Sequence, residues 1–172
     1  MGFLQLISSD GNRSWNRWIL AFFIRFLIAS IILYAVYLKL GNYYARLICH
    51  GARPLVSLFG HRVIMSKALL ITEDISLNPV VFLSLVIAVM NIPVGKKIRG
   101  AVIGIIILSL ANSLTVSMAF LSYYRGSEAL WTGTEFFNLT INFFLPLFLA
   151  FALLPVKSAL PPSWMKKENN SG

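Results

Sequence analysis

The sequence predicts an all-α polytopic membrane protein with about four transmembrane helices, an outer interfacial amphipathic helix and a short β-like segment. Of its 172 residues, 58% are hydrophobic and 12% are charged, and the mean hydropathy is +0.76. A typical soluble domain is about half apolar and about 25% charged. Because a membrane-crossing helix needs roughly 20 apolar residues, the length fits a single membrane domain at 18–155 and excludes a large soluble catalytic domain.

The first span is predicted at about residues 18–38. A basic and aromatic collar that includes Arg17 and Trp18 precedes an apolar run in which Arg25 is the charged exception. The run is longer than the roughly 7 to 15 residue core of a cleavable signal peptide, and no small-residue cleavage motif follows it. We therefore expect a retained helix after a cytoplasmic tail at 1–17, with Arg25 reaching headgroups or pairing within the bundle.

The next segment, at about 41–61, is predicted to be an amphipathic helix, because its polar residues recur every three or four positions. The polar set is Asn42, Arg46, His50, Arg53, Ser57 and His61. The apolar set is Tyr43, Tyr44, Leu47, Ile48, Leu55, Leu58 and Phe59. We expect this helix in the outer membrane interface, kinked or split at Pro54.

Its basic residues either contact lipid phosphates or form a docking surface for an acidic partner. This candidate partner- or lipid-binding set is Arg46, His50, Arg53, His61 and Arg62. A short β-like segment follows at about 62–71, because apolar and polar residues alternate loosely there. Glu73 and Asp74 come next and are expected to pair with an arginine, since adjacent strand residues point to opposite faces.

The remaining spans are predicted at about residues 76–92, 99–122 and 136–154. The helix of the second span is expected to begin at Pro79, because a proline is tolerated in the first helical turn. A basic turn at 93–99 leads into the third span, a polar loop into the fourth, and a polar tail occupies 156–172. Basic residues concentrate in the two tails and in the 93–99 turn, so the positive-inside rule predicts that both termini are cytoplasmic.

Neutral polar residues form single-face stripes in the last two spans, at Asn112, Thr115, Asn138 and Asn142. Such residues usually hydrogen-bond across membrane helices, and the alternative is a ligand pocket. Cys49 and His50 are consecutive and do not face each other on a helix, so we interpret Cys49 as an apolar filler. The sequence therefore predicts no catalytic residue, no metal site and no cofactor. The net charge of +9 is attributed to lipid headgroups, not to nucleic acid.

Several short motifs follow one another at about 20–155: Arg25-Phe26-Leu27, Leu58-Phe59-Gly60, Ser76-Leu77-Asn78-Pro79, Pro93 to Arg99, Asn112, and Glu135-Phe136-Phe137. In this order they resemble the exosortase and archaeosortase family, in particular the compact exosortase H type. The resemblance implies a membrane-embedded cysteine transpeptidase that uses a Cys, an Arg and a His. At the matching positions this chain has Ile75 or Ser76, Ser113 to Thr115, and Asn138. The resemblance therefore implies a fold kept without the activity.

Together these features predict a non-catalytic, exosortase-like integral membrane subunit of a larger complex in the bacterial inner membrane. Its role would be structural, assembling or stabilising, and its partners would be membrane lipids and other integral membrane subunits. Two alternatives remain. One is an active enzyme, either a sortase-like transpeptidase that uses Cys49 with His50 or His61, or a lipid transferase. The other is a small lipid-binding or transport protein that uses the asparagine and threonine stripes.

Overall fold

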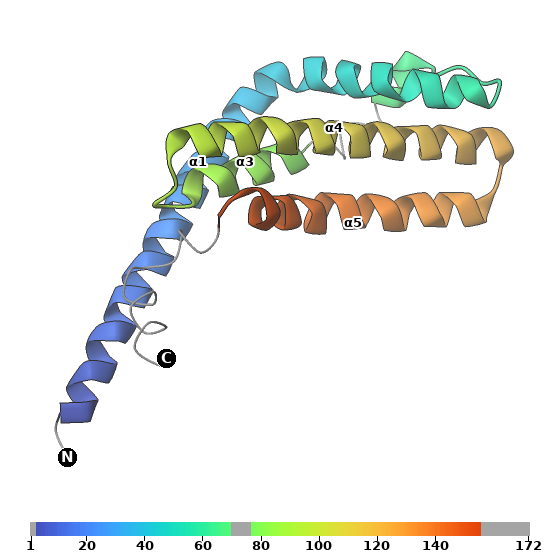
Figure 1. Cartoon of the computed structure of the whole chain (residues 1–172). Helices are drawn as coiled ribbons and strands as arrows, with labels where there is room; N and C mark the ends of the chain where they lie inside the picture. The colour runs from blue at the N-terminus through green and yellow to red at the C-terminus, as the bar shows by residue number, and fades with distance from the viewer. Residues whose placement is uncertain (1–2, 70–76, 156–172) are drawn as a thin grey trace.

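The chain folds into an elongated bundle of helices from which the N-terminal part of the first helix protrudes (Figure 1). The computed structural model describes residues 3–69 and 77–155. Its labelled helices are α1 (Phe3–Leu58), α3 (Asn78–Ala88), α4 (Val94–Arg125) and α5 (Glu128–Leu153). Every regular element within the described residues is helical, which confirms the predicted all-α class.

The longest helix, α1, joins two elements that were predicted to be separate, the span at 18–38 and the amphipathic segment at 41–61. The polar residues between them lower the hydropathy but are compatible with helical backbone. Of the predicted kink or split at Pro54, the split is wrong, because α1 continues to Leu58. A proline near the end of a helix removes one backbone bond, and packing of the neighbouring turns holds this helix together.

The predicted β-like segment is not a strand in its described part. Residues 62–64 are irregular, residues 65–69 are helical, and residues 70–71 lie outside the described part of the chain. Ala68 is fully buried, and its N–H donates to the carbonyl of Ile64 at 3.0 Å. A helical turn satisfies its own backbone groups, whereas a strand needs a neighbouring strand, and none is present among the described residues.

α3 is shorter than the second predicted span. It begins at Asn78 with Pro79 in its first turn, as predicted. It ends at Ala88, and Asn91 then adopts a left-handed conformation with a φ of 61°, ahead of Pro93. Its 11 residues rise about 16 Å, which is about half the thickness of a bilayer core.

α4 and α5 form a helical hairpin with a two-residue connection. Gly126 ends α4 in the left-handed conformation, and the Ser127 hydroxyl accepts from the Leu130 N–H at 3.4 Å to cap α5. The polar loop predicted before the fourth span is therefore mostly helix, and the basic turn predicted at 93–99 is largely the first turns of α4. Gly at a helix end and Ser before a helix are strong boundary signals, which hydropathy does not register.

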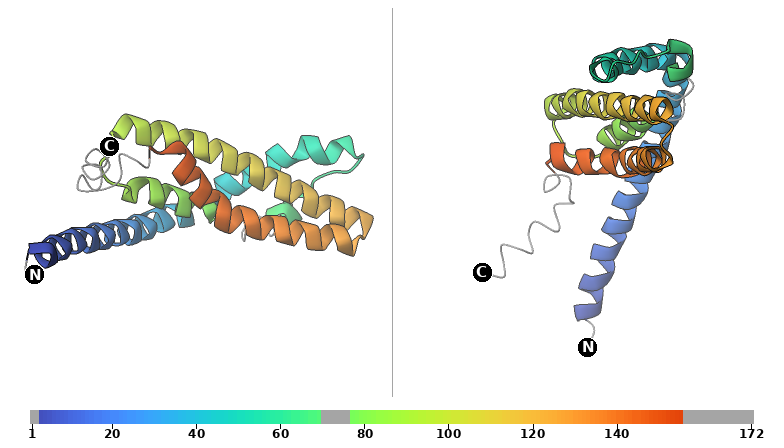
Figure 2. Two further views of the ribbon diagram at one scale, coloured as in Figure 1. Left: turned by 60° about the horizontal axis from the view of Figure 1, so that its bottom comes forward. Right: turned by 90° about the vertical axis from the view of Figure 1, so that its right-hand side faces the viewer.

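α4 lies at the centre of the bundle. α5 runs antiparallel along one side of α4, and α3 and the C-terminal part of α1 cover another (Figures 1 and 2). The right-hand view of Figure 2 shows the cyan part of α1 above α4 and α5 below it. α3 contacts the N-terminal half of α4, where Phe82 meets Gly104, and α1 contacts the C-terminal half, where Ile48 clusters with Val116.

Two apolar clusters hold these helices together. The first joins α1 to α4 and comprises Ile48, Cys49, Ala52, Val56, Ala68, Val116 and Phe120. The second joins α3, α4 and α5 and comprises Phe82, Val86, Ile92, Leu108, Leu149, Ala150 and Leu154. Phe82 is fully buried, and a Cβ at Gly104 would overlap its ring. Gly104 thus permits the close approach of α3 to α4.

Three helices are long and apolar enough to cross a membrane: α1 from Arg17 to Leu58, α4 and α5, while α3 is a shorter apolar helix. Their outward faces carry large exposed apolar side chains, including Leu27, Ile31, Phe143, Phe144, Phe148 and Phe151. Apolar exposure on this scale is typical of surfaces that meet lipid or another subunit.

Gly104→Leu is expected to destabilise the bundle, because a side chain at this position collides with the buried Phe82 ring. Overpacking a core costs about 1–3 kcal/mol, so the midpoint of thermal unfolding in detergent should fall. Gly133→Leu in α5 is the matched control, because a Cβ there meets no atom within 4 Å. Equal effects of the two substitutions would contradict the described packing of α3 on α4.

Candidate functional site: a buried amide junction and an exposed cationic stripe

Two asparagines and a tyrosine join α1, α3 and α4 inside the bundle. Asn78 Nδ2 donates to Asn112 Oδ1 at 2.9 Å, and Asn112 Nδ2 donates back to Asn78 Oδ1 at 3.1 Å. Asn112 Nδ2 also donates to Tyr44 Oη at 3.1 Å. The two asparagines are only 2% and 0% exposed. Because a buried amide that loses its partner is costly, this amide junction fixes the register of the three helices.

Hydroxyl groups of α4 bond to backbone carbonyls of α1. Ser113 Oγ donates to the carbonyl of Ile48 at 3.2 Å, and Ser117 Oγ donates to that of Ala52 at 3.4 Å. The two helices approach closely at Gly51, where a Cβ would lie 2.5 Å from Ser113 Oγ. Small residues and serine hydroxyls at a helix contact are typical of packing between membrane helices.

The two predicted polar stripes have different roles. Asn112 belongs to the amide junction, while Thr115 is buried and donates to the carbonyl of Ala111 in its own helix at 3.1 Å. In α5, Asn142 Nδ2 donates to Asn138 Oδ1 at 2.9 Å, so this bond also stays within one helix. The Oδ1 atom of Asn142 is buried without a hydrogen-bond partner in the described part of the chain. Asn112 alone of the four makes a described hydrogen bond to another helix.

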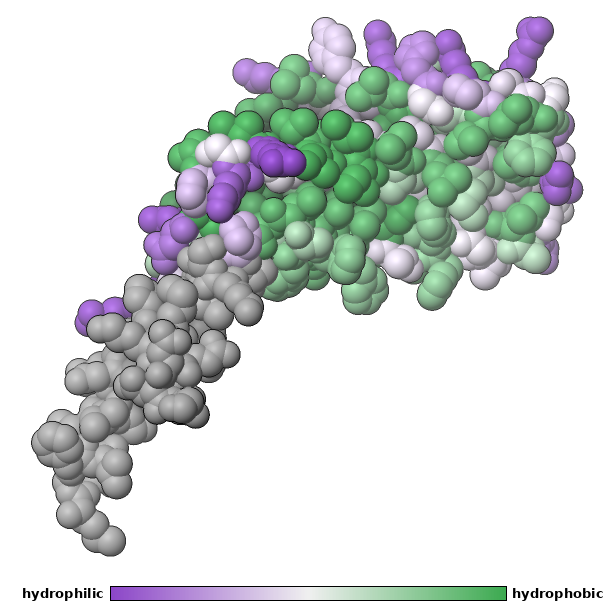
Figure 3. All heavy atoms as spheres, in the orientation of Figure 1, coloured by the Kyte–Doolittle hydropathy of each residue, from purple (hydrophilic) through white to green (hydrophobic). Residues whose placement is uncertain are grey.

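Three of the predicted basic residues, Arg46, His50 and Arg53, form an exposed row on α1 that we call the cationic stripe. Their spacing of four and three places them on one helix face. The stripe runs along the bundle, because this part of α1 lies beside α4. In Figure 3, hydrophilic side chains gather over this part of α1, whereas hydrophobic side chains cover much of the surface below it.

The apolar set predicted for this segment is divided between two faces. Ile48 is 0% exposed and Tyr44 is partly buried against α4, whereas Leu47, Leu55 and Leu58 are exposed. The other residues buried on the face turned to α4 are smaller: Ala45, Cys49, Ala52 and Val56. The segment therefore has three faces: a buried one that holds Ile48 and small residues, an exposed apolar one and a cationic one.

The cationic stripe has no acidic partner within the described part of the chain. The carboxylates whose side chains are described, Glu128 and Glu135, both belong to α5, which lies on the other side of α4. Glu135 accepts a hydrogen bond from Trp131 Nε1 at 2.8 Å. The predicted pairing of Glu73 and Asp74 with an arginine lies outside the described residues. Within the described chain, the positive charge of the stripe is thus uncompensated.

His61 and Arg62 lie beyond the end of α1, next to the C-terminal end of α4. The His61 ring stacks on Tyr124 with centroids 4.4 Å apart, and Tyr124 Oη donates to the backbone carbonyl of Arg62 at 2.7 Å. His61 and Arg62 line a pocket of about 350 Å³ together with Arg53 and Ser57. The five predicted basic residues therefore form two groups, those of the cationic stripe and those that line this pocket. Arg53 belongs to both groups.

Cys49 is 0% exposed and packs in the cluster with Val116 and Phe120. His50, the next residue, is exposed on the cationic stripe. A buried sulfur next to an outward-facing imidazole does not form a nucleophile–base pair that a substrate can reach. Within the described residues, no group of three or more His, Cys, Asp or Glu side chains could hold a metal ion.

Sequence reasoning missed Asn78, Ser113 and Ser117 as contact residues. Ser113 and Ser117 are four positions apart, so their shared helix face could have been recognised. Asn78 stands directly before Pro79, and the start of a helix usually suggests a solvated cap. Its burial depends on where α3 meets α4, which the sequence pattern does not contain.

The positions at which the family resemblance implies catalytic chemistry carry structural contacts instead. Ser113 and Thr115 bond to backbone carbonyls, and Asn138 bonds to Asn142, while residues 75–76 lie outside the described chain. The chain matches no model of a known protein family, no curated protein and no solved structure. The exosortase-like resemblance therefore stays a prediction that rests on the sequence.

Asn78→Leu and Asn112→Leu are each expected to destabilise the bundle, because each leaves a buried amide without its partner. The double variant should lose less than the sum of the two single variants. Hydrogen bonds between membrane helices give coupling energies of about 0.6 kcal/mol on average and up to about 1.7 kcal/mol. A double-mutant cycle measured by unfolding in detergent provides the test.

The control cycle pairs Asn112→Leu with Asn138→Leu. The described hydrogen bond of Asn138 stays within α5, so this pair should be additive. Additivity of Asn78→Leu and Asn112→Leu would contradict the amide junction.

The Cys49 thiol is expected to resist a membrane-impermeant thiol reagent in the native protein, because the residue is fully buried. Unfolding in SDS should make it reactive. Arg62→Cys in a Cys49→Ala background is the control, since Arg62 is exposed beyond the end of α1. Rapid labelling of native Cys49 would contradict the packing of α1 on α4.

Proposed function

We propose that this chain is an integral protein of the bacterial inner membrane and a non-catalytic subunit of a larger membrane complex. Three long apolar helices, α1, α4 and α5, support membrane embedding. The outward-facing Leu, Ile and Phe side chains on α1 and α5 provide an apolar surface for lipid. The polar groups of α4 bond to neighbouring helices, which suits a structural role.

Both termini are proposed to face the cytoplasm. α4 begins with Lys96, Lys97 and Arg99, and by the positive-inside rule this end is cytoplasmic. The end of α5 lies beside the same end of α4, because a Cβ at Gly100 would be 3.4 Å from Leu154. With α3 counted as part of the second of four crossings, the N-terminus falls on the same side. The short length of α3 is then offset by its burial between α1, α4 and α5.

The cationic stripe is the observation that favours a protein partner. Between Arg46 and His50, the carbonyl of Ile48 bonds to Ser113, which lies in the middle third of α4. In a chain whose α4 crosses the bilayer, the Arg46–His50 part of the stripe therefore lies at membrane depth. Charged side chains there are costly unless they face a bundle interior, a water-filled cavity or an opposite charge.

Because the stripe lies on the outer surface of this chain, a neighbouring subunit can supply the opposite charge or the bundle interior that such side chains need. The partner would place Asp or Glu side chains opposite the stripe, because complementary charges fix the register of two surfaces. The lipid-headgroup interpretation suits a helix that lies in the interface, whereas this helix packs lengthwise along α4. The degenerate exosortase-like resemblance agrees with a fold that has kept its architecture and lost its chemistry.

The double substitution Arg46→Glu and Arg53→Glu is expected to abolish binding to the partner, because it sets like charges against each other at the interface. The test is purification of the tagged chain from its native membrane in mild detergent, followed by native mass spectrometry. The unaltered chain should bring partners in fixed stoichiometry, and the charge-reversed chain should recover at least tenfold less of them. Leu47→Ala, on the exposed apolar face of the same helix, is the control and should retain them.

Full recovery of the same partners by the charge-reversed variant would contradict the docking role of the stripe. Release of the unaltered chain from membranes by alkaline carbonate would contradict membrane embedding. A fully functional lone monomer would contradict the subunit role.

A further inference from the structure

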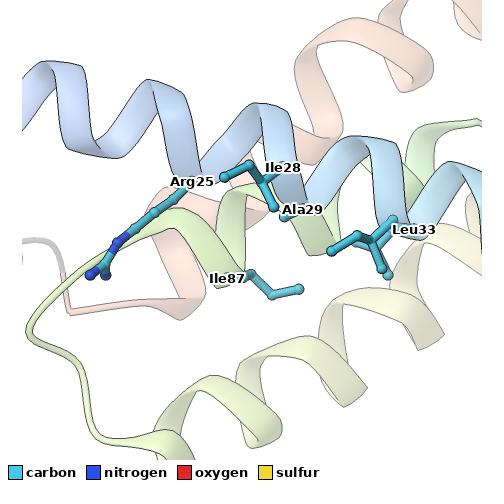
Figure 4. A pocket seen from close by; sticks show the side chains of 6 residues that line it. Arg25, Ile28, Ala29, Leu33 and Ile87 are labelled. Carbon is cyan, nitrogen blue, oxygen red and sulfur yellow. The ribbon is translucent and has the colours of Figure 1, made fainter.

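A groove outside the amide junction and the cationic stripe lies between α1 and the C-terminal end of α3. Its first section is a pocket of about 370 Å³ lined by Arg25, Ile28, Ala29, Ile32, Leu33 and Ile87. Figure 4 shows Ile28, Ala29 and Leu33 on α1, with Ile87 of α3 pointing into the space beside them. Arg25 is the charged member of this lining, and the rest is aliphatic.

The groove continues along α1. A second pocket of about 270 Å³ shares Leu33 with the first and is lined further on by Leu40 of α1, Leu83 of α3 and Ile105 of α4. Tyr44 also lines this second pocket, and its hydroxyl bonds to Asn112 in the amide junction. The two pockets adjoin at Leu33, and we call their combined apolar lining the apolar track, which has Arg25 at one end and Tyr44 at the other.

The cationic end carries more than one positive charge. Arg25 extends away from the apolar lining toward the end of α3 (Figure 4). Lys97 Nζ donates to the carbonyl of Ile87 at 3.2 Å. Because Ile87 lines the pocket together with Arg25, this bond places a second cation at the same mouth. Lys96 and Arg99 are exposed on the adjoining turn of α4.

Within the described chain, no carboxylate balances the positive charge at this mouth. The carboxylates whose side chains are described, Glu128 and Glu135, belong to the first third of α5, whereas Leu154, just past the end of α5, lies beside this end of α4. Cations also stand unfavourably at the N-terminus of a helix, where the backbone dipole favours an anion. An anionic ligand would relieve both the repulsion between Arg25 and Lys97 and the unfavourable dipole interaction.

We propose that this groove binds one anionic phospholipid, with its phosphate against Arg25 and Lys97 and one acyl chain along the track toward Tyr44. The occupant combines the two chemistries that the groove presents, a phosphate for the cationic mouth and a hydrocarbon chain for the aliphatic lining. Free phosphate has no hydrocarbon chain to occupy the apolar track, and a zwitterionic lipid compensates less of the positive charge at the mouth. The inference rests on the proposed membrane embedding and assigns a lipid class to a site distinct from the cationic stripe.

Binding of dioleoyl phosphatidylglycerol to the detergent-purified full chain, followed by native mass spectrometry, tests the proposal. The unaltered chain should bind one molecule more tightly than it binds dioleoyl phosphatidylcholine. Arg25→Gln should weaken phosphatidylglycerol binding about fivefold, the effect expected for one basic residue at a membrane surface. Arg125→Gln removes the same charge from the opposite end of α4 and should leave binding unchanged.

Ile87→Trp tests the apolar track while keeping both cations. Ile87 is 49% exposed, so a larger side chain can fill the groove without displacing the core. This variant should bind less phosphatidylglycerol than the unaltered chain, and inorganic phosphate should not compete for the site. Equal binding by the unaltered chain, Arg25→Gln and Ile87→Trp would overturn the proposal, as would equal affinity for the two lipids.

The two proposals fail in different ways. A chain that withstands alkaline carbonate extraction but does not prefer phosphatidylglycerol would overturn the lipid site and leave membrane embedding in place. A chain that carbonate releases would overturn membrane embedding and the lipid site together.

Discussion

The reciprocal hydrogen bonds between Asn78 and Asn112 set the arrangement on which the other contacts depend. An apolar helix can slide along another at little cost, but two buried amides that satisfy each other allow one register. From that register Phe82, one turn after Asn78, meets Gly104, two turns before Asn112. Tyr44 brings α1 to the same point. One polar contact thus positions three helices around the middle of α4.

α4 packs against each of the other labelled helices because it presents a different set of small or hydroxyl-bearing side chains to each of them. Gly104 admits the Phe82 ring of α3, and serine hydroxyls reach the carbonyls of α1. Toward α5, the hydroxyls of Ser122 and Thr134 are 3.2 Å apart. Polar and small residues therefore share the interior of the bundle with a few large side chains such as Phe82 and Phe120, while many large apolar residues lie on its outside. This distribution is typical of helices that pack in lipid, between which hydrogen bonds and close packing replace the hydrophobic effect.

The positive charge of the chain is organised by this same packing. Burial of the face of α1 that holds Ile48 turns Arg46, His50 and Arg53 outward along the bundle, and contact between α1 and α3 places Arg25 and Lys97 at the same mouth. The first group forms a row suited to a facing protein helix. The second forms the head of an apolar track suited to a lipid. The surroundings of the cations are what indicate a binding role for both surfaces. An isolated exposed cation is ordinary, but a cation that borders apolar surface requires a partner.

The sequence by itself determined the all-α class, the three long apolar helices, the start of α3 at Pro79 and the outward-facing basic row, because periodicity and composition act locally. It treated 18–38 and 41–61 as separate elements and allowed a split at Pro54, whereas α1 is one continuous helix. Only the tertiary structure decided that Ile48 and the small residues around it face α4, that Asn78 meets Asn112 and that Arg25 heads an apolar groove. Each of these depends on how closely two helices approach, and that distance is set by side chains remote in sequence, such as Gly51 and Ser113.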